Sequence, residues 1–359
     1  MNKLPELKLD HLFNLTDSTG IIQHARYHIP DRKHGYCLDD NARALLVIAL
    51  YKKNYVTNSR IEKLAETYLS FIDHAYNPIS RKYRNFMNYA HEWLEEEGSD
   101  DSQGRTLWAV GTLAADPHFE YLHFYLEKLL DQCMHREFRS PNSIAFALLG
   151  LTELAKENKN EGFPITEIIQ NQTEKLWNLI QNNRKPGWLW CSGVVTYDGC
   201  RIPQSLISAG YVLANPALIK EGLKILDWLI IHQFKNEIFV PIGNDGWMTE
   251  HQKADFDQQP LETAAMIDAC IIAGTITQNP KYFASAVIAF NWFTGSNLIG
   301  ESLYDPLTGG CRDGIGSHGT NKNQGAESTL SWLSSLLTMQ LFQEKLDRGN
   351  FKNFRYESL

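Results

Sequence analysis

Two acidic motifs in this sequence, residues 38–43 (LDDNAR) and 100–105 (DDSQGR), each open a long apolar run. In both motifs an arginine stands four residues after one of the two adjacent aspartates. Carboxylates are favoured in the first turn of a helix, and this spacing places the arginine beside them. One such entry is explained by a helix cap and a local ion pair. Several that converge on one end of a protein would instead line a polar cavity.

A second motif, Q-x-x-E-[ST], also precedes apolar runs and occurs at residues 259–263 and 324–328. Glutamine is a poor N-cap, so Glu262 and Glu327 do not fit the usual capping box, which begins with Ser, Thr, Asp or Asn. For both glutamates, a structural role and a position in the lining of a cavity are equally compatible with the sequence. A desolvated carboxyl there would have the raised pKa that a general acid requires.

These motifs supply the candidate acid–base groups. Two carboxyl groups on either side of a glycosidic bond, one protonated and one acting as base or nucleophile, are the usual apparatus of glycoside hydrolysis. The sequence does not say which carboxyls would pair. The candidate catalytic residues are Asp40, Asp101, Glu262 and Glu327, with Asp39 and Asp313 as reserves.

Side chains on or beside the polar loops are the candidate substrate-binding groups. Aromatic rings stack on sugar rings, although large aromatics also pack loops onto a core. Loop histidines are more often surface residues than catalysts. The set comprises Tyr36, Asp39, Arg43, Trp93, Arg105, Trp188, Trp190, Gln204, Trp247, His251, Gln259, Tyr304, Arg312, Asp313, His318 and Gln324.

Helices must position these residues, because apolar spacing of the i, i+3, i+4, i+7 type recurs along the chain. Runs that are apolar nearly all round predict buried helices, and runs with one apolar stripe predict amphipathic helices that cover them. The two kinds alternate, which is a repeat signature. We expect buried helices at 39–52, 101–115, 140–155, 201–214, 259–275 and 324–341. The amphipathic helices are expected near 60–76, 118–136, 165–182, 216–234 and 279–294, with a chain end forming the sixth.

The connections between helices are unequal in length. Those that lead into buried helices are long and rich in Gly, Asn, Asp and aromatic residues, whereas the return connections are short. Long loops in compact domains are usually functional. Because all of them precede buried helices, they would gather on one face, with short hairpins and turns near 239–257 and 304–321.

Six buried helices ringed by six amphipathic ones describe an all-α fold, a single (α/α)6 toroid that spans residues 1–359. At this level the sequence resembles the six-hairpin glycosidase-like superfamily, over nearly its whole length. More narrowly, the motifs GYCLDDNARAL, DSQGRTLW, DQQPLETA and TGGCRDG…NQGAEST resemble those of bacterial proteins with no assigned reaction that occur beside, or fused to, glycosyltransferases. The chain lacks the HD-type signature of the unsaturated uronyl hydrolases and the inner-helix histidine pair of the sugar epimerases.

Composition excludes several other classes. The net charge of −8 and the lack of a Lys/Arg cluster disfavour nucleic-acid binding. There is no Gly-rich strand-to-helix turn of the G-x-G-x-x-G kind, which disfavours a Rossmann domain. There is also no secretory h-region and no run of about 18 apolar residues, so we expect a cytoplasmic protein without a membrane span. Six scattered cysteines without zinc spacing predict free thiols, no metal and no cofactor.

The leading hypothesis is therefore a glycosidase that acts on an oligosaccharide, with inversion expected by analogy to many toroid enzymes. A non-catalytic glycan-binding or scaffold partner of a glycosyltransferase is the first alternative. Sugar epimerisation with His251 or His318 as base, and phosphorolysis with a phosphate held by Arg312 and its glycines, are further ones.

Overall fold

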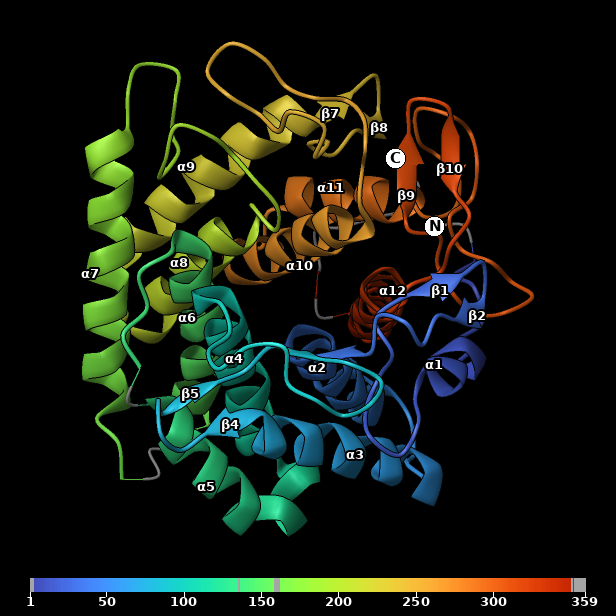
Figure 1. The fold of residues 1–359 in the computed structure, drawn as a ribbon. Coiled ribbons are helices and arrows are strands. Elements are labelled where there is room, and N and C mark those ends of the chain that lie inside the picture. The colour runs from blue at the N-terminus through green and yellow to red at the C-terminus, as the bar shows by residue number, and fades with distance from the viewer. Residues whose placement is uncertain (1–2, 135, 158–161, 350, 352–359) are drawn as a thin grey trace.

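The computed structural model describes residues 3–134, 136–157, 162–349 and 351. Within them six helices form a closed inner ring, in which each packs against the next and the last packs against the first (Figure 1). All six begin and end within a few residues of the bounds expected from the sequence, α12 excepted, which runs six residues further. They are α2 (Leu38–Asn54), α4 (Asp100–Ala115), α6 (Pro141–Lys156), α8 (Arg201–Val212), α10 (Pro260–Thr277) and α12 (Ala326–Asp347).

An outer layer of helices covers this ring, and five of the six outer helices pack on the inner helix before them in the chain. The (α/α)6 toroid predicted from the sequence is confirmed. The chain start supplies the sixth outer helix, the short α1 (Asp10–Leu15), which packs on α12. The others are α3 (Ser59–Ala75), α5 (His123–Met134) after a 3-10 turn at Pro117–Leu122, α7 (Ile165–Asn183), α9 (Pro216–Gln233) and α11 (Pro280–Asn291).

The inner helices pack closely where small residues let their backbones meet. A Cβ atom on Gly104 of α4 would lie 2.4 Å from the carbonyl oxygen of Ser143 in α6. A Cβ atom on Gly150 of α6 would lie 2.4 Å from the carbonyl oxygen of Leu107 in α4. Only glycine fits at such contacts, so α4 and α6 are held together by backbone proximity as much as by side-chain packing.

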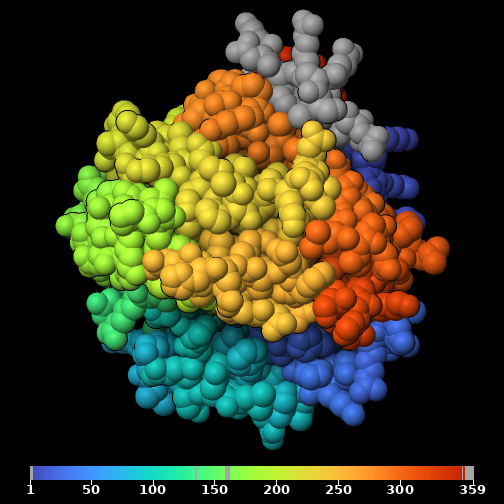
Figure 2. Space-filling view, turned by 90° about the horizontal axis from the view of Figure 1, so that it is seen from above, coloured from blue at the N-terminus to red at the C-terminus, as the bar shows by residue number. Residues whose placement is uncertain are grey.

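The long loops carry short antiparallel strand pairs, as expected for hairpins and turns. The pair before α12 is a true hairpin in which Thr320 faces Ile315. Ile315 also bridges to Gln258, so the loops before α10 and α12 lie side by side, as the yellow-to-orange surface of Figure 2 shows. The pairs are β1 (Ala25–Arg26) with β2 (Ile29–Pro30), β3 (Tyr36–Cys37) with β6 (Phe86–Met87), β4 (Tyr76–Asn77) with β5 (Lys82–Tyr83), β7 (Phe234–Lys235) with β8 (Ile238–Phe239), and β9 (Gly314–Gly316) with β10 (Gly319–Asn321).

The six cysteines are all buried and free, as predicted. Within the described residues one helix, α10, is long and apolar enough to cross a membrane. That helix belongs to the inner ring, where its neighbours α8, α11 and α12 cover it. Its apolar character is explained by this burial.

Candidate functional site

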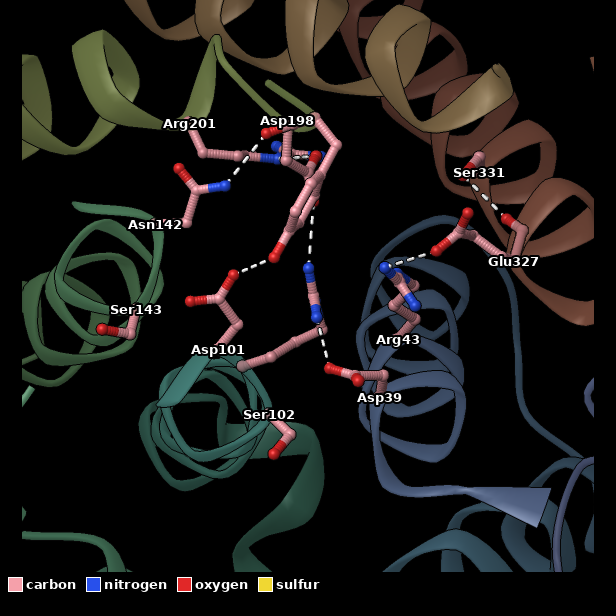
Figure 3. A network of polar contacts seen from close by, with 12 residues as sticks. Asp39, Arg43, Asp101, Ser102, Asn142, Ser143, Asp198, Arg201, Glu327 and Ser331 are labelled. Atoms are coloured by element: carbon pink, nitrogen blue, oxygen red, sulfur yellow. Dashed lines mark hydrogen bonds and ion pairs between the residues drawn. The ribbon is translucent and has the colours of Figure 1, made fainter. Parts of the chain in front are cut away.

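Charged side chains meet where the inner helices begin (Figure 3). They come from five of the six inner helices and point toward one another across the N-terminal end of the toroid. We call this set the polar ring. It consists of Asp39, Asp40 and Arg43 of α2, Arg105 of α4, Asp198 and Arg201 at the start of α8, Glu262 of α10 and Glu327 of α12.

The first turn of α2 is capped by Cys37 rather than by an aspartate. The Cys37 sulfur accepts the backbone N–H of Asp40 at 3.4 Å, and its thiol donates to Asp40 Oδ2 at 3.1 Å. At α4 the cap is Ser99, whose hydroxyl oxygen accepts the backbone N–H of Ser102 at 3.1 Å. Both aspartates of α2 are therefore released from capping and take part in the polar ring instead.

Arg105 joins three inner helices at the centre of the ring. Its guanidinium is buried, donates to Asp39 of α2, and lies 3.1 Å from Asp198 Oδ2 at the start of α8. Its carbon Cζ lies 4.2 Å from the ring centroid of Phe146 in α6. Burial raises the pKa of Asp39, but the charges of Arg105 and Arg43 outweigh that effect, and the net shift is downward.

Arg43 bridges the first and last inner helices. It donates to Asp40 Oδ1 at 3.0 Å and to Glu327 Oε2 at 2.7 Å. Asp40 lies beneath it, only 5% exposed, and burial raises the pKa of its carboxyl to about 6 although Arg43 opposes the shift. The side chain of Asp39 is 17% exposed. Of the two aspartates of α2, Asp39 is therefore the more accessible.

Asp198 connects α4, α8 and α10, and sequence reasoning missed it. Its backbone is left-handed (φ 56°), its N–H donates to Glu262 Oε1 at 2.7 Å, and its carboxylate contacts Arg105 and, at 3.5 Å, Arg201 Nε. A signal was present, because residues 198–201 (DGCR) repeat the Asp-x-x-Arg spacing of residues 40–43 at another helix start.

Among the carboxyl groups of the ring, that of Glu262 has the pKa that is shifted furthest from its ordinary value. Its residue is 3% exposed, and burial raises the pKa of its carboxyl well above the ordinary value, with the negative charges of Asp198 and Glu327 adding to the effect. Backbone N–H donation from Asp198 opposes the shift. Glu327 on the neighbouring α12 is 39% exposed at its side chain and ion-paired with Arg43. The ring therefore contains a buried carboxyl, Glu262, and a more exposed one, Glu327, that is paired with an arginine.

The two aspartates at the start of α4 have different roles. Asp100 Oδ2 accepts the backbone N–H groups of Arg139 at 2.8 Å and Ser140 at 3.2 Å, which ties α4 to the segment before α6. Asp101 is half-buried and accepts the hydroxyl groups of Ser140 and Tyr197. Asp101 therefore borders the ring through neutral hydrogen bonds, without an ion pair among the described residues.

A cavity of about 360 Å³ lies inside the toroid, below the ring, and all six inner helices line it. At its ring end Arg201 Nη1 contacts Asp268 Oδ2 at 2.7 Å and Gln204 Oε1 at 2.8 Å. Most of the remaining wall is apolar, and Lys53 and Lys345 lie at the ends of their helices. Gln204, a predicted binding residue, reaches this cavity. Asp268, the only acidic side chain inside the apolar run of α10, was not predicted.

Four of the six predicted stacking aromatics do not offer a free ring face, which corrects the sequence interpretation. Tyr36, Trp188, Trp190 and Tyr304 are buried. The two loop tryptophans pack on the outer-helix residue Trp228, with centroid distances of 5.2 Å for Trp188 and 6.3 Å for Trp190. Loops this long cover the apolar ends of outer helices, and large aromatics supply the buried area.

The remaining two predicted aromatics, Trp93 and Trp247, are partly exposed. His251 and His318 are exposed on loops, and no hydrogen bond or ion pair joins them to the polar ring among the described residues. No contact among the described residues therefore supports either histidine as an acid–base group of the ring. Apart from its three arginines, the titratable groups that the ring brings together are carboxylic acids.

The predicted residues before α10 and α12 mostly order loops. Gln259 stands at the N-cap of α10 without a side-chain cap, as expected for glutamine. Gln324 donates to Asp305 Oδ2 at 2.8 Å and accepts from Thr308 at 2.7 Å, so its amide is engaged in the loop.

The loop of Arg312 and Asp313 is held from both sides. Arg312 contacts Glu301 at 3.3 Å and Thr320 at 3.2 Å across the hairpin. Asp313 Oδ1 accepts the backbone N–H of Gly325 at 2.7 Å, and burial raises the pKa of its carboxyl. The charge of Glu327 adds to this shift, which places Asp313 near the α12 edge of the ring.

Comparison with known proteins identifies the fold. No protein-family model matches the sequence, and the search of curated proteins found no match. Among solved structures, a sugar epimerase from a ruminal bacterium is similar with a TM-score of 0.70 and 12% identity, over 94% of this chain and 95% of that one. The cellobiose 2-epimerase of Bacillus thermoamylovorans has a TM-score of 0.72 and 9% identity, over 94% of this chain and 96% of that one. A family 76 α-mannanase of Bacteroides thetaiotaomicron has a TM-score of 0.60 and 11% identity, over 93% of each chain. The shared feature is the (α/α)6 toroid.

Proposed function

We propose that this protein is a carbohydrate-active enzyme whose active site is the polar ring, and that its leading reaction is hydrolysis of a glycosidic bond. The observation that carries the proposal is the pair Glu262 and Glu327. One carboxyl is desolvated and has a raised pKa, while the other is accessible and ion-paired. Carboxyl pairs whose environments push their protonation states apart are the arrangement that acid–base catalysis at neutral pH uses.

In this proposal Glu262 protonates the leaving oxygen and Glu327 acts on the other side of the bond. Arg43 holds the Glu327 carboxylate in place at 2.7 Å. The backbone N–H of Asp198 fixes the orientation of the Glu262 carboxyl at 2.7 Å. Asp39 and Asp101, the more accessible of the remaining carboxylates, would bind sugar hydroxyl groups. Inversion at the anomeric carbon remains the expected outcome.

The fold similarity supports a carbohydrate substrate, because the structures it matches include a mannanase and sugar epimerases. It also supports a second candidate reaction, the epimerisation or isomerisation of a sugar. A D-mannose isomerase is similar too, with a TM-score of 0.66 and 10% identity. Epimerisation would use the same carboxyl pair to move a proton at carbon, and Arg43 would stabilise the enediolate oxygen by its charge.

One experiment separates the two reactions. The protein is incubated in D2O with mannose- and glucose-containing oligosaccharides and with free aldoses, and products are followed by NMR. Hydrolysis predicts new reducing ends without deuterium at carbon, whereas epimerisation predicts deuterium at C2 of a free or terminal sugar. Replacement of the acid, Glu262→Gln, should abolish either reaction.

A matched control is Glu167→Gln, an exposed glutamate in the first turn of the outer helix α7, which should retain full activity. Saccharide binding without turnover on the whole panel would contradict the enzymatic proposal. That result would favour a glycan-binding partner of a glycosyltransferase instead.

A further inference from the structure

The cavity inside the toroid continues from the polar ring along the axis of the fold. On α10 the residues that line it run from Leu261 to Thr275, and on α12 they run from Leu330 to Lys345. At 1.5 Å per residue, each of these lining faces is about 20 Å long. Because the cavity follows the inner helices over such a length, we call it the axial channel.

The two ends of the axial channel are polar. At one end the channel is lined by Arg43, Arg105 and Arg201, which are the arginines of the polar ring. At the other end it is lined by Lys53 and Lys345, which are exposed in the last turns of α2 and α12. The channel is therefore continuous with the candidate active site at one end and reaches the surface at the other.

Apolar side chains form most of the wall between these ends. Several of them are only partly buried, although they belong to inner helices that the outer layer covers. An occupant that covered these side chains would remove apolar surface from water, which is favourable. The partly buried apolar residues of the wall are Leu46, Leu50, Trp108, Ile271, Ile272 and Leu341.

Polar groups within the wall are engaged with the protein itself. Asp268 pairs with Arg201 at 2.7 Å and accepts the hydroxyl of Thr338 at 3.2 Å. The hydroxyls of Ser331 and Ser334 donate to carbonyl oxygens of their own helix at 2.7 Å and 3.0 Å, as Figure 3 shows for Ser331. A sugar inside the channel would exchange hydrogen bonds with water for aliphatic contacts, which is costly. The wall therefore favours an apolar chain over a second sugar.

We propose that the axial channel binds the apolar chain of an amphiphilic glycoside whose sugar lies at the polar ring. The inference rests on the proposed function, because that function places the sugar there. Arg43 links the two parts, since it lines the channel and pairs with the accessible Glu327 at 2.7 Å. The volume of about 360 Å³ is typical of small-molecule sites, and the elongated form fits one unbranched chain. The substrate would then carry an alkyl group, in place of a second sugar, beyond its glycosidic bond.

Isothermal titration of the full chain with methyl, hexyl and octyl β-D-glucoside tests the proposal, each below its micelle concentration. The alcohols 1-hexanol and 1-octanol serve as chains without a sugar. Each CH₂ group that enters the channel should raise the affinity about fourfold. Octyl glucoside should therefore bind about 15-fold more tightly than hexyl glucoside, and the two alcohols should differ by the same factor.

A variant that fills the channel shows where the chain binds. Ser334→Trp adds an indole to the channel wall on α12 and should abolish the dependence of affinity on chain length. The matched control Ile231→Trp adds the same side chain at an exposed position of the outer helix α9 and should leave that dependence unchanged. If Ser334→Trp does not fold, nuclear Overhauser effects in the wild type between the alkyl chain and the indole of Trp108 replace it.

Three results would overturn the proposal. Octyl glucoside and 1-octanol could bind no more tightly than their shorter homologues, or Ser334→Trp could keep the full dependence on chain length. The third is a lack of Overhauser effects between the bound chain and Trp108.

Turnover of the same glucosides separates this proposal from the proposed function. Dependence of affinity on chain length without cleavage would support the channel as a chain site and count against hydrolysis. Cleavage of oligosaccharides without any dependence on chain length would overturn the channel proposal and leave the proposed function standing.

Discussion

The two sides of the polar ring are built differently. The entries of α2, α4 and α8 each bring an arginine, and these arginines form ion pairs with the aspartates around them. The entries of α10 and α12 bring glutamates and no cation of their own. Arg43 reaches Glu327 from α2, whereas Glu262 makes no ion pair among the described residues.

This difference separates two tasks. Where arginine and aspartate alternate, the arginines lower the pKa of the accessible Asp39, although burial raises that of Asp40 beneath it. The accessible part of that side is therefore suited to hold and orient polar groups. On the other side no cation pairs with Glu262, and burial and like charge raise the pKa of its carboxyl, so that side is suited to proton transfer. The predictions below test this division.

The largest effect is expected for Glu262→Gln. The amide keeps the shape of the carboxyl but cannot transfer a proton, so kcat should fall about 10³-fold with little loss of stability. Turnover on the preferred saccharide and thermal unfolding measure the two effects. An equal fall in Arg105→Lys without loss of stability would contradict the division between the sides.

On the balanced side the larger effect should be on stability. Arg105→Met leaves Asp39 and Asp198 without their shared partner, and breaking a buried pair of this kind costs about 3–5 kcal/mol in the free energy of unfolding. Urea denaturation measures it. The exposed pair of Arg26 with Asp31 is the matched control, and Arg26→Met should cost less than about 1 kcal/mol.

The pH dependence of stability should distinguish the two aspartates of α2. Burial raises the pKa of Asp40 from 3.8 to about 6, so between these values the folded protein binds more protons than the unfolded chain and loses stability as pH rises. Asp40→Asn removes this loss. Its free energy of unfolding relative to wild type should therefore increase by up to about 3 kcal/mol from about pH 4 to about pH 7.

Asp39→Asn should show the opposite sign. The pKa of Asp39 is lowered overall, since its arginine partners outweigh burial, so the wild type gains stability as pH rises toward 3.8. The relative stability of this variant should therefore decrease over the acidic range. Urea unfolding of both variants between about pH 3 and about pH 7 gives the comparison. Parallel pH profiles would contradict the assigned environments.

The smallest effect is expected for the loop histidines. His251→Asn and His318→Asn, made singly, should change kcat by less than about twofold, because both side chains are exposed and no described contact links them to the ring. A loss of activity comparable to that of Glu262→Gln would move the acid–base chemistry from the carboxyl side to the loops.

Local pattern predicted the architecture well. Runs that are apolar all round form the inner helices, and runs with one apolar stripe form the outer helices. The spacing of apolar residues predicts this because it reflects whether a helix is buried on every side or on one side only. α10, expected at 259–275, lies at Pro260–Thr277. The acidic helix starts were also readable, since carboxylates in a first turn are a local feature.

The partners of those acids could not be read in the same way. Arg105 meets Asp198 across 93 positions of sequence, a contact that only the closure of the ring creates. The fate of loop aromatics is equally non-local: Trp188 is buried because Trp228 of α9 lies beneath it. Sequence spacing gives the residues of the site, but their charge pairing depends on which helices become neighbours.

The protonation state of Glu262 tests the central claim most directly. Infrared difference spectra between the wild type and Glu262→Gln, recorded at neutral pH, should contain the carbonyl band of a protonated carboxyl in the wild type only. A spectrum in which the substitution removes only carboxylate bands would show that Glu262 is ionised. That result would contradict its assignment as the general acid of the polar ring.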